Sequence, residues 1–434
     1  MFSLKKPIET REHTTSYYAA SANWQTDYAQ LRGEVDVDVA VIGGGFSGIN
    51  TALELAERGY RVAVVEANRV AWGASGRNGG QVIGGIGHSL EQFERQIGQE
   101  GIKSIYAMGV ECVDIIRARV EKYTIDCDLT WGYCDVAIKP RHMRELEEEK
   151  QYQEDMGCPH ALELLDKDRL SYEVSSDRYI GGLMNRNGAG HCQPMNLCLG
   201  EAQAAEQLGV QIYEQSRVTR LVTGKKPRVE TESGAVNANF VVLCGNAYLG
   251  NLVPKLAARV LPASSSIIAT TPLRRDQIDA TMPGNRAVCD LNTALDYFRL
   301  SADKRLLFGG LSNYTGLEPR DVSAVMREKM VRVFPSMADV AIEFAWSGYI
   351  GIGLNRMPQV GRIEDNVFFI QAFSGHGVAP THMMARITAQ MIAGQAERFD
   401  VFARIKHHPF PGGKFLRRPA LALGMLYYRL KDLL

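Results

Sequence analysis

The chain has 434 residues, 45% of them hydrophobic and 23% charged, which excludes a mainly disordered chain and is enough for two or three packed domains. Lysine plus arginine and aspartate plus glutamate both number 49, so the formal net charge is zero and nucleic acid is not an expected partner. No stretch reaches the ~18 consecutive apolar residues of a membrane span, and the first residues lack a secretory pattern, so we expect a cytoplasmic protein.

The first predicted unit, residues 36–66, has the order strand, turn, helix, strand. Alternating valines precede GGGFSG (43–48), helical periodicity follows over 49–58, and RVAVVE (61–66) has the pattern of a buried strand. A G-x-G-x-x-G element between a strand and a helix is typical of a dinucleotide-binding unit. The alternative is a glycine-rich turn in some other α/β fold.

Each part of this unit suits a pyrophosphate-linked dinucleotide. Gly43 permits the tight turn, Gly45 lets the backbone approach the pyrophosphate, and Gly48 lets the helix pack on the strand. The helix N-terminus offers unpaired N–H groups to the phosphates. Glu66 ends the second strand, where its carboxylate can accept hydrogen bonds from a ribose 2′-hydroxyl and would repel a 2′-phosphate, so NADP is disfavoured.

Helices and short strands follow. Helical patterns extend over 89–122, as one long helix or a helical pair, and over 141–156 and 195–209. Short strands are predicted at VQIYE, SRVTRLV, PRVETE and NFVVLCG (210–214, 216–222, 227–232 and 239–245). Strand-like segments within 264–310 indicate an antiparallel sheet, and 366–394 returns to strand, glycine-rich turn and helix.

This order predicts the α/β class, with a nucleotide-binding domain made of separated segments and a second, α+β domain inserted between them. The predicted divisions are an N-terminal arm (1–35), a nucleotide-binding domain (36–82, 195–260 and 345–400), a substrate domain containing the antiparallel sheet (83–194 and 261–344), and a C-terminal extension (401–434).

Two more glycine-rich turns, WGASGRNGGQ (72–81) and FSGHGV (373–378), favour FAD over NAD, because a longer cofactor needs backbone contacts at both ends. The helix start after the third turn could stabilise negative charge on a reduced flavin ring near N1 and the C2 carbonyl. His376 could add a donor there; the alternative is that it caps the helix or meets solvent. The residues expected to contact FAD are Gly43, Gly45, Phe46, Ser47, Gly48, Glu66, Ala67, Ala74, Ser75, Arg77, Asn78, Gly79, Gly80, Gln81, Val218, Gly245, Gly375, His376, Gly377 and Val378.

A family resemblance covers nearly the whole chain. Its most specific stretches are GASGRNGGQ (73–81) and SGHGV (374–378), and SYYAASAN (16–23), GNAYLG (245–250) and RMPQVGR (356–362) also carry it. The sequence resembles the D-amino-acid oxidase superfamily of flavoproteins, which includes sarcosine and glycine oxidases, and within it the γ-glutamylputrescine oxidoreductases.

The resemblance implies a Rossmann-like FAD-binding domain of the D-amino-acid oxidase and glutathione reductase type, noncovalently bound FAD, and oxidation of an amine to an imine. Some members attach FAD through a cysteine in the stretch that matches GYIGIGLNR (348–356). That stretch contains no cysteine here, so a thioether at this place is excluded.

Two departures from related enzymes bear on the substrate. Amino-acid oxidases carry an arginine in a W-x-G-x-R pattern that pairs with the substrate carboxylate, and Ile350 stands at that position here. Ala379 stands where sarcosine oxidase has a lysine after its SGHG. A buried carboxylate without a cation is costly, so we expect a terminal amine on an aliphatic chain rather than an α-amino acid.

The reaction needs an unprotonated amine that loses hydride toward flavin N5, and the imine then hydrolyses to an aldehyde. An aromatic or apolar cage would favour the neutral amine. Tyr297 and Trp346, with His376, are expected beside the reacting atoms, although packing in the core is the alternative for each aromatic side chain. The residues expected to contact the substrate are Trp131, Tyr133, Phe298, Arg299 and Ile350. Arg299 could meet a distal carboxylate or form a surface salt bridge, and no general base is identified.

The remaining patterns predict little chemistry. The eight cysteines lack C-x-x-C spacing and the histidines lack ligand spacing, so we expect free thiols and no metal site. The apolar run PALALGMLYYRLKDLL (419–434) is expected to form a helix docked on the protein, with a peripheral membrane contact as the minor alternative.

Three functions remain open from the sequence. The first is an FAD amine oxidase acting on γ-glutamylputrescine or a related polyamine derivative, with O2 reduced to H2O2. The second is a dehydrogenase with the same half-reaction that passes electrons to a quinone or carrier protein. The third is a non-catalytic protein that keeps the fold to bind a partner, which the three glycine-rich turns disfavour.

Overall fold

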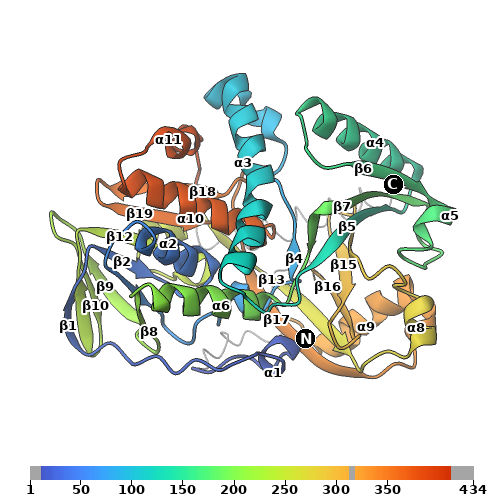
Figure 1. Ribbon diagram of the computed structural model, residues 1–434, viewed down its shortest axis with the longest axis horizontal. Coiled ribbons are helices and arrows are strands. Elements are labelled where there is room, and N and C mark those ends of the chain that lie inside the picture. Colours follow the sequence, from blue (N-terminus) through green and yellow to red (C-terminus); the bar gives the residue numbers. More distant parts are fainter. Residues whose placement is uncertain (1–10, 312–317, 412–434) are drawn as a thin grey trace.

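The computed structural model describes residues 11–311 and 318–411, and within these ranges the strands form three sheets (Figure 1). The first sheet has the strand order β18-β19-β12-β2-β3-β8. Its strands are β2 (Val39–Ile42), β3 (Val62–Val65), β8 (Gln211–Tyr213), β12 (Phe240–Leu243), β18 (Gln359–Glu364) and β19 (Val367–Gln371). All neighbours are parallel except β18, which runs antiparallel at the edge.

The parallel strands are apolar on both faces because both faces are covered. Val39 and Val41 of β2 belong to a core with the helices on one side, whereas Ala40 and Ile42 pack into a second core on the other side. The helices are α2 (Phe46–Ala56), α3 (Glu94–Lys122), α6 (Pro194–Gln207) and α10 (Val378–Ile392). The other face meets a four-stranded sheet of β1 (Gly33–Asp36), β9 (Val218–Val222), β10 (Arg228–Thr231) and β11 (Gly234–Asn237).

The third sheet has nine strands and follows the order β17-β13-β16-β15-β14-β5-β7-β4, with β6 beside β7. Its neighbours are antiparallel apart from the pair β14 and β5. The bounds are β4 (Gln81–Val82), β5 (Thr130–Ala137), β6 (Leu162–Asp166), β7 (Gly181–His191), β13 (Leu261–Thr270), β14 (Ala287–Asp290), β15 (Asp296–Leu300), β16 (Leu306–Leu311) and β17 (Ile342–Ile352). The predicted antiparallel sheet is therefore present and larger than its sequence segment suggests.

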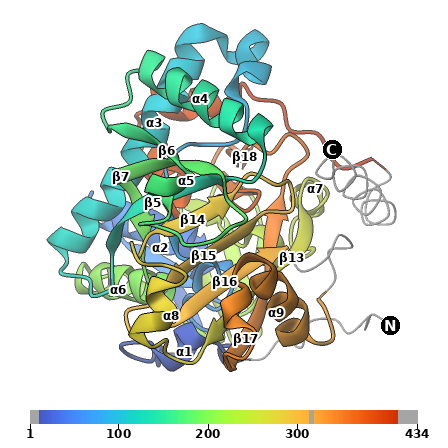
Figure 2. The same ribbon diagram turned by 90° about the vertical axis from the view of Figure 1, so that its right-hand side faces the viewer.

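Helices cover the outer parts of this sheet (Figure 2). Met326 and Met330 of α9 pack with Ile268 and Phe308 in one apolar cluster. The helices in this half are α4 (Pro140–Asp155), α5 (Lys167–Leu170), α8 (Arg275–Asp279) and α9 (Val322–Val333). Shorter helices elsewhere are α1 (Tyr17–Ala20), α7 (Pro254–Ala257) and α11 (Glu397–Ala403).

Three elements lie differently from the predicted domain division. Helix α3, within the 83–194 segment, contacts α10 of the first half, and it is kinked at Gly98, where φ is 70°. Strand β4 (81–82) and strand β17, which starts at 342 and crosses the division at 345, both belong to the nine-stranded sheet. The α/β class itself is confirmed.

Buried charges connect the helices of the first half. The Glu54 carboxylate on α2 pairs with Arg119 of α3 at 2.6 Å and with Arg386 of α10 at 2.9 Å. Glu201 on α6 contacts His382 of α10 at 2.7 Å. Burial opposes ionisation of Glu54, but Arg119 and Arg386 outweigh it and hold its pKa below the usual value. These contacts fix α10 against α2, α3 and α6.

Within the described ranges, no helix is both long and apolar enough to cross a membrane. The run 419–434, expected to form a docked helix, lies outside the described residues. All eight cysteines are free thiols, and seven of them are buried. No group of three His, Cys, Asp or Glu side chains that could hold a metal ion occurs in 11–311 or 318–411.

Candidate active site

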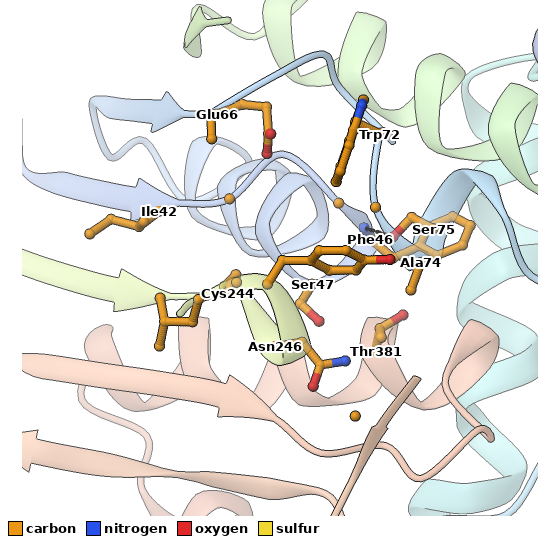
Figure 3. Close-up of a pocket in the computed structure, with 18 of the residues that line it drawn as sticks. Ile42, Phe46, Ser47, Glu66, Trp72, Ala74, Ser75, Cys244, Asn246 and Thr381 are labelled. Atoms are coloured by element: carbon orange, nitrogen blue, oxygen red, sulfur yellow. Dashed lines mark hydrogen bonds between the residues drawn. The ribbon is translucent and has the colours of Figure 1, made fainter. Parts of the chain in front are cut away.

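A groove crosses the carboxyl ends of β2 and β3, the place where open α/β sheets bind dinucleotides. Its walls come from the turn after β2, the end of β3, residues 72–78, the segment after β12, and the first turn of α10. Figure 3 shows Glu66 toward one end of this groove and Ala74 and Ser75 toward the other.

Glycines set the shape of the first turn. Gly43 has a φ of 111°, and a Cβ there would lie 3.1 Å from the backbone of Cys244. A Cβ on Gly48 would lie 1.8 Å from the Gly43 carbonyl oxygen, so α2 packs directly on the turn. The first and last glycines of the motif therefore have the roles that the sequence predicts.

Two helix N-termini open into the groove; the Ser75 hydroxyl accepts the Phe46 N–H at the start of α2 at 2.8 Å, and the residue before α10 provides no side-chain cap. Gly45 precedes α2 and Gly377 precedes α10, and neither provides a capping side chain. Ser47 and Thr381, from the first turns of the two helices, line the groove beside them (Figure 3). The helix dipoles and the remaining first-turn N–H groups favour negative charge at both places. This arrangement fits a cofactor with a pyrophosphate in the middle and an electron-accepting ring at one end.

Glu66 lies at the end of β3 and lines the groove. Its carboxylate accepts the N–H groups of Gly44 at 2.6 Å and Asn68 at 2.8 Å. Burial raises the pKa of Glu66, and these two hydrogen bonds act in the opposite direction. Each carboxylate oxygen keeps a lone pair that a ribose hydroxyl can use.

Side chains fix the second glycine-rich turn from within. The Asn78 amide donates to the carbonyls of Ala74 and Ser75, and its oxygen accepts the Gly80 N–H at 2.8 Å. The Arg77 guanidinium donates to the Trp72 carbonyl at 2.9 Å and lies 4.2 Å from the centre of the Trp72 ring. The positive charge of Arg77 therefore interacts with Trp72 and is not directed at a ligand.

A second cavity of about 710 Å³ adjoins the groove. The two share the lining residues Ala74, Asn78, Ile350, Gly375, Gly377 and Val378. Its far wall is the face of the nine-stranded sheet, with Tyr133 on β5, Cys289 on β14 and Tyr297 on β15. A long cofactor in the groove would therefore place its end at the entrance to a cavity large enough for a substrate.

The structure distributes the residues expected to contact FAD between these two spaces. Those lining the groove are Gly43, Gly45, Phe46, Ser47, Glu66, Ala67, Ala74, Ser75, Asn78, Val218, Gly245, Gly375, Gly377 and Val378. Those lining only the adjoining cavity are Arg77, Gly79, Gln81 and His376. Gly48 and Gly80 line neither space and instead allow close packing behind the two turns.

Three of the residues expected near the substrate line the cavity. Ile350 lies where the groove and the cavity meet, so an apolar side chain borders the place where the cofactor's ring would end. Tyr133 and Tyr297 lie on the sheet wall. A Cβ on Gly79 would lie 2.5 Å from the Tyr297 ring and one on Gly309 2.2 Å, so this ring is held between two glycines.

Two aromatic residues lie outside the cavity for reasons of strand geometry. Phe298 follows Tyr297 on β15 and therefore points to the opposite face, where it stacks on Phe308 in the core. Trp131 is separated from Tyr133 by a β-bulge at Gly132, and its ring lies under the Arg117 guanidinium at 3.7 Å. Neither residue contacts the cavity.

Two further expectations are corrected by burial. Arg299 is 3% exposed and donates to the carbonyls of Gly79 at 2.8 Å and Cys192 at 2.7 Å, so it supports the second turn and has no contact with the cavity. Trp346 is 2% exposed, and its indole N–H donates to the Arg77 carbonyl. Both residues position the second turn from behind.

His376 lines the cavity but its ring is engaged. Its Nε2 lies 2.8 Å from the Gly84 carbonyl oxygen, which can only accept, so this nitrogen carries the proton. Burial lowers the pKa of His376, and the neutral ring then has no second N–H to donate. The donors that this turn offers a flavin are backbone N–H groups, not the side chain.

Sequence reasoning missed several residues that line these spaces. Asp135, Ser265 and Asp290 lie on the sheet wall of the cavity, and Asn246 and Tyr248 line the groove. The signal for Asp135 was present, because it stands two residues after Tyr133 and shares its face of the strand. Strands β13 and β14 reach the cavity only through long-range pairing, which no local pattern specifies.

A dinucleotide groove that opens into a second cavity on an α/β fold is the arrangement expected of a flavin-dependent oxidoreductase. The family model described as FAD dependent oxidoreductase matches residues 38–391, and the chain belongs to this family. The protein is thus an FAD-dependent oxidoreductase, as the resemblance predicts.

Two relatives match over nearly their full lengths. A γ-glutamylputrescine oxidoreductase of Escherichia coli is 43% identical over 422 residues, which cover 97% of this chain and 99% of the relative. A probable oxidoreductase OrdL of Haemophilus influenzae is 41% identical over 429 residues, with 97% and 98% covered. The predicted family membership is confirmed.

Solved structures share the fold at low sequence identity. L-proline dehydrogenase from P. horikoshii aligns with a TM-score of 0.68 and 21% identity, covering 84% of this chain and 94% of that one. Glycine oxidase from Bacillus cereus aligns with a TM-score of 0.66 and 21% identity, covering 84% and 97%. At this identity the similarity describes the fold alone.

Proposed function

We propose that this protein oxidises the terminal amine of γ-glutamylputrescine or of a related polyamine derivative, with O2 as the electron acceptor. The observation that carries the proposal is Ile350, an apolar side chain at the junction of the cofactor groove and the substrate cavity. An α-carboxylate placed there would be desolvated without a cation, whereas an aliphatic chain loses nothing. The high identity to the Escherichia coli relative over both full lengths supports the same substrate.

Different residues would bind the cofactor in the groove and the substrate in the cavity. The N-terminal starts of α2 and α10 would hold the pyrophosphate and the ring end of FAD, and Glu66 would hold its ribose. When bound, FAD supplies the two-electron acceptor for oxidation of the carbon–nitrogen bond. Ile350 and Tyr297 would border the reacting nitrogen and favour its uncharged form by removing it from water.

Anaerobic bleaching of the bound flavin tests the substrate. We expect γ-glutamylputrescine to bleach the flavin with a lower dissociation constant than putrescine, and simple D- or L-α-amino acids to bleach it far more slowly. Bleaching by an α-amino acid at a rate equal to that of γ-glutamylputrescine would contradict the proposal.

Oxygen consumption tests the acceptor separately. We expect one H2O2 per aldehyde formed in air. Turnover that requires an added quinone and yields no peroxide would instead establish a dehydrogenase with the same amine-oxidising half-reaction.

A further inference from the structure

The wall of the substrate cavity contains a carboxylate that no protein cation neutralises. Asp135 on β5 lines the cavity and is half-buried. One of its oxygens accepts the Tyr133 hydroxyl at 2.6 Å. Within 11–311 and 318–411, no lysine, arginine or histidine pairs with Asp135, and no further donor contacts its side chain. A carboxylate removed from water without a cation is destabilised, so its place on a cavity wall points to a cationic ligand.

Asp290, the other acid on this wall, has several hydrogen-bond donors within the protein. Asp290, at the end of β14, accepts the N–H groups of Asn292 at 3.1 Å and Asp296 at 3.2 Å, and also the Asn292 side-chain amide. These bonds fix the turn between β14 and β15. Asp290 is therefore a structural acid, and Asp135 is the acid that faces the cavity with unused acceptor capacity.

Sheet register gives the position of Asp135 relative to the cofactor. Tyr297 on β15 pairs with Cys289 on β14, and Cys289 pairs with Asp135 on β5, so the three residues form one row across neighbouring strands. Tyr297 packs against Gly79 of the second cofactor turn. Two strand spacings separate the ends of the row, which places Asp135 about 10 Å from the residue that touches this turn.

We propose that Asp135 binds a second, distal ammonium group of the amine substrate while the reacting nitrogen lies uncharged beside Ile350. This inference rests on the proposed function. In γ-glutamylputrescine, ten bonds separate the terminal amine from the α-ammonium group, a reach of about 12 Å when extended. That reach is comparable with the length of the row, whereas putrescine alone, with five bonds between its nitrogens, spans about half of it.

The test compares two substrates that differ only in the distal ammonium group. The pair is γ-glutamylputrescine and N-glutarylputrescine, in which hydrogen replaces the α-ammonium group. Their dissociation constants come from the substrate dependence of anaerobic flavin bleaching by the holoenzyme. We expect the wild type to prefer γ-glutamylputrescine about 10- to 100-fold and Asp135→Asn to remove this preference.

Glu149→Gln is the matched control, because Glu149 is a carboxylate on α4 that acts on Asp135 only at a distance and does not line the cavity. We expect this variant to keep the preference. Flavin content and far-UV circular dichroism show whether Asp135→Asn folds, and Asp135→Ser provides a second variant if it does not.

Each outcome supports or overturns the assignment. If Asp135→Asn keeps the preference for γ-glutamylputrescine, Asp135 does not bind the distal ammonium group. A rise of both dissociation constants by the same factor is such a result, because it leaves the preference unchanged. If only amines that are not polyamine derivatives reduce the wild type, the proposed function fails, and the comparison of such a diamine with its analogue lacking the second ammonium group decides separately whether Asp135 binds that group. If no amine reduces the wild type, both proposals fail.

Discussion

A carboxyl group that is buried on a cavity wall without a cation destabilises the folded protein. Burial raises the pKa of Asp135 to about 7 against the hydrogen bond from Tyr133, and Glu149 adds to the rise. The unfolded value is about 4. Because the unfolded chain releases this proton first, the free energy of unfolding falls as the pH rises from about 4 to about 7, and the full loss is present above that range.

Asp135→Asn should therefore stabilise the holoenzyme in the absence of substrate. We expect its melting temperature to exceed that of the wild type by a few degrees at pH 8 and the difference to vanish near pH 4. Asp36→Asn, at an exposed acid, makes the same change in net charge as a control. Equal melting temperatures for the wild type and Asp135→Asn at pH 8 would show that the Asp135 carboxylate does not destabilise the folded protein.

Ile350→Arg should change which amines the site accepts. A guanidinium at the junction of groove and cavity would repel an amine that arrives protonated and would pair with an α-carboxylate. We expect kcat/KM for γ-glutamylputrescine to fall at least about 100-fold and turnover of α-amino acids to appear, measured by peroxide release or anaerobic bleaching. Ile350→Leu, which keeps an apolar side chain, serves as the control for packing.

Among the elements, strand alternation decides which predicted site residues reach the cavity. Strand β15 lies within the strand-like region 264–310, yet Tyr297 and Phe298 are neighbours on this strand and point to opposite faces. The glycine-rich turns were predictable because a tight turn, a close approach and a helix start are all local requirements. The bulge at Gly132 and the pairing of β14 with β5 depend on distant chain segments, so Trp131 was misplaced and Asp290 was missed.

The helices around Glu54 give a stability prediction at the same scale. Arg119 and Arg58 both pair with Glu54, but the Arg119 side chain is 5% exposed and that of Arg58 is 27% exposed. Arg119→Ala removes a buried cation that pairs with Glu54 and Glu201. This change should lower the free energy of unfolding by about 3–5 kcal/mol. Arg58→Ala should cost at most about 1 kcal/mol.

Urea unfolding followed by circular dichroism measures both variants, provided that the transitions are two-state. If Arg119→Ala lowers the free energy of unfolding no more than Arg58→Ala does, the buried charges contribute little to the docking of α3 and α10.

At the scale of the whole molecule, the six-stranded sheet is assembled from segments far apart in the chain. Strands β2 and β3 come from residues 39–65, β8 and β12 from 211–243, and β18 and β19 from 359–371. The nine-stranded sheet takes most of its strands from the intervening residues (Figure 1). Both walls of the groove are therefore complete only when β19 and α10 are in place.

A chain ending at Asp365 should consequently lack bound flavin. It removes β19, the third glycine-rich turn and α10, and so leaves the apolar edge of β12 uncovered. We expect it to be recovered colourless and aggregated, whereas a chain ending at Pro411, which keeps every element described here, should be yellow. Visible absorbance and size-exclusion chromatography distinguish the two, and a yellow shorter chain would contradict this account.

The late position of β19 also has a consequence during translation. Strands β2 and β12 lie side by side in the finished sheet, and both emerge from the ribosome before β19, the other neighbour of β12. The nascent protein therefore exposes an unpaired β12 edge while residues 244–366 are made.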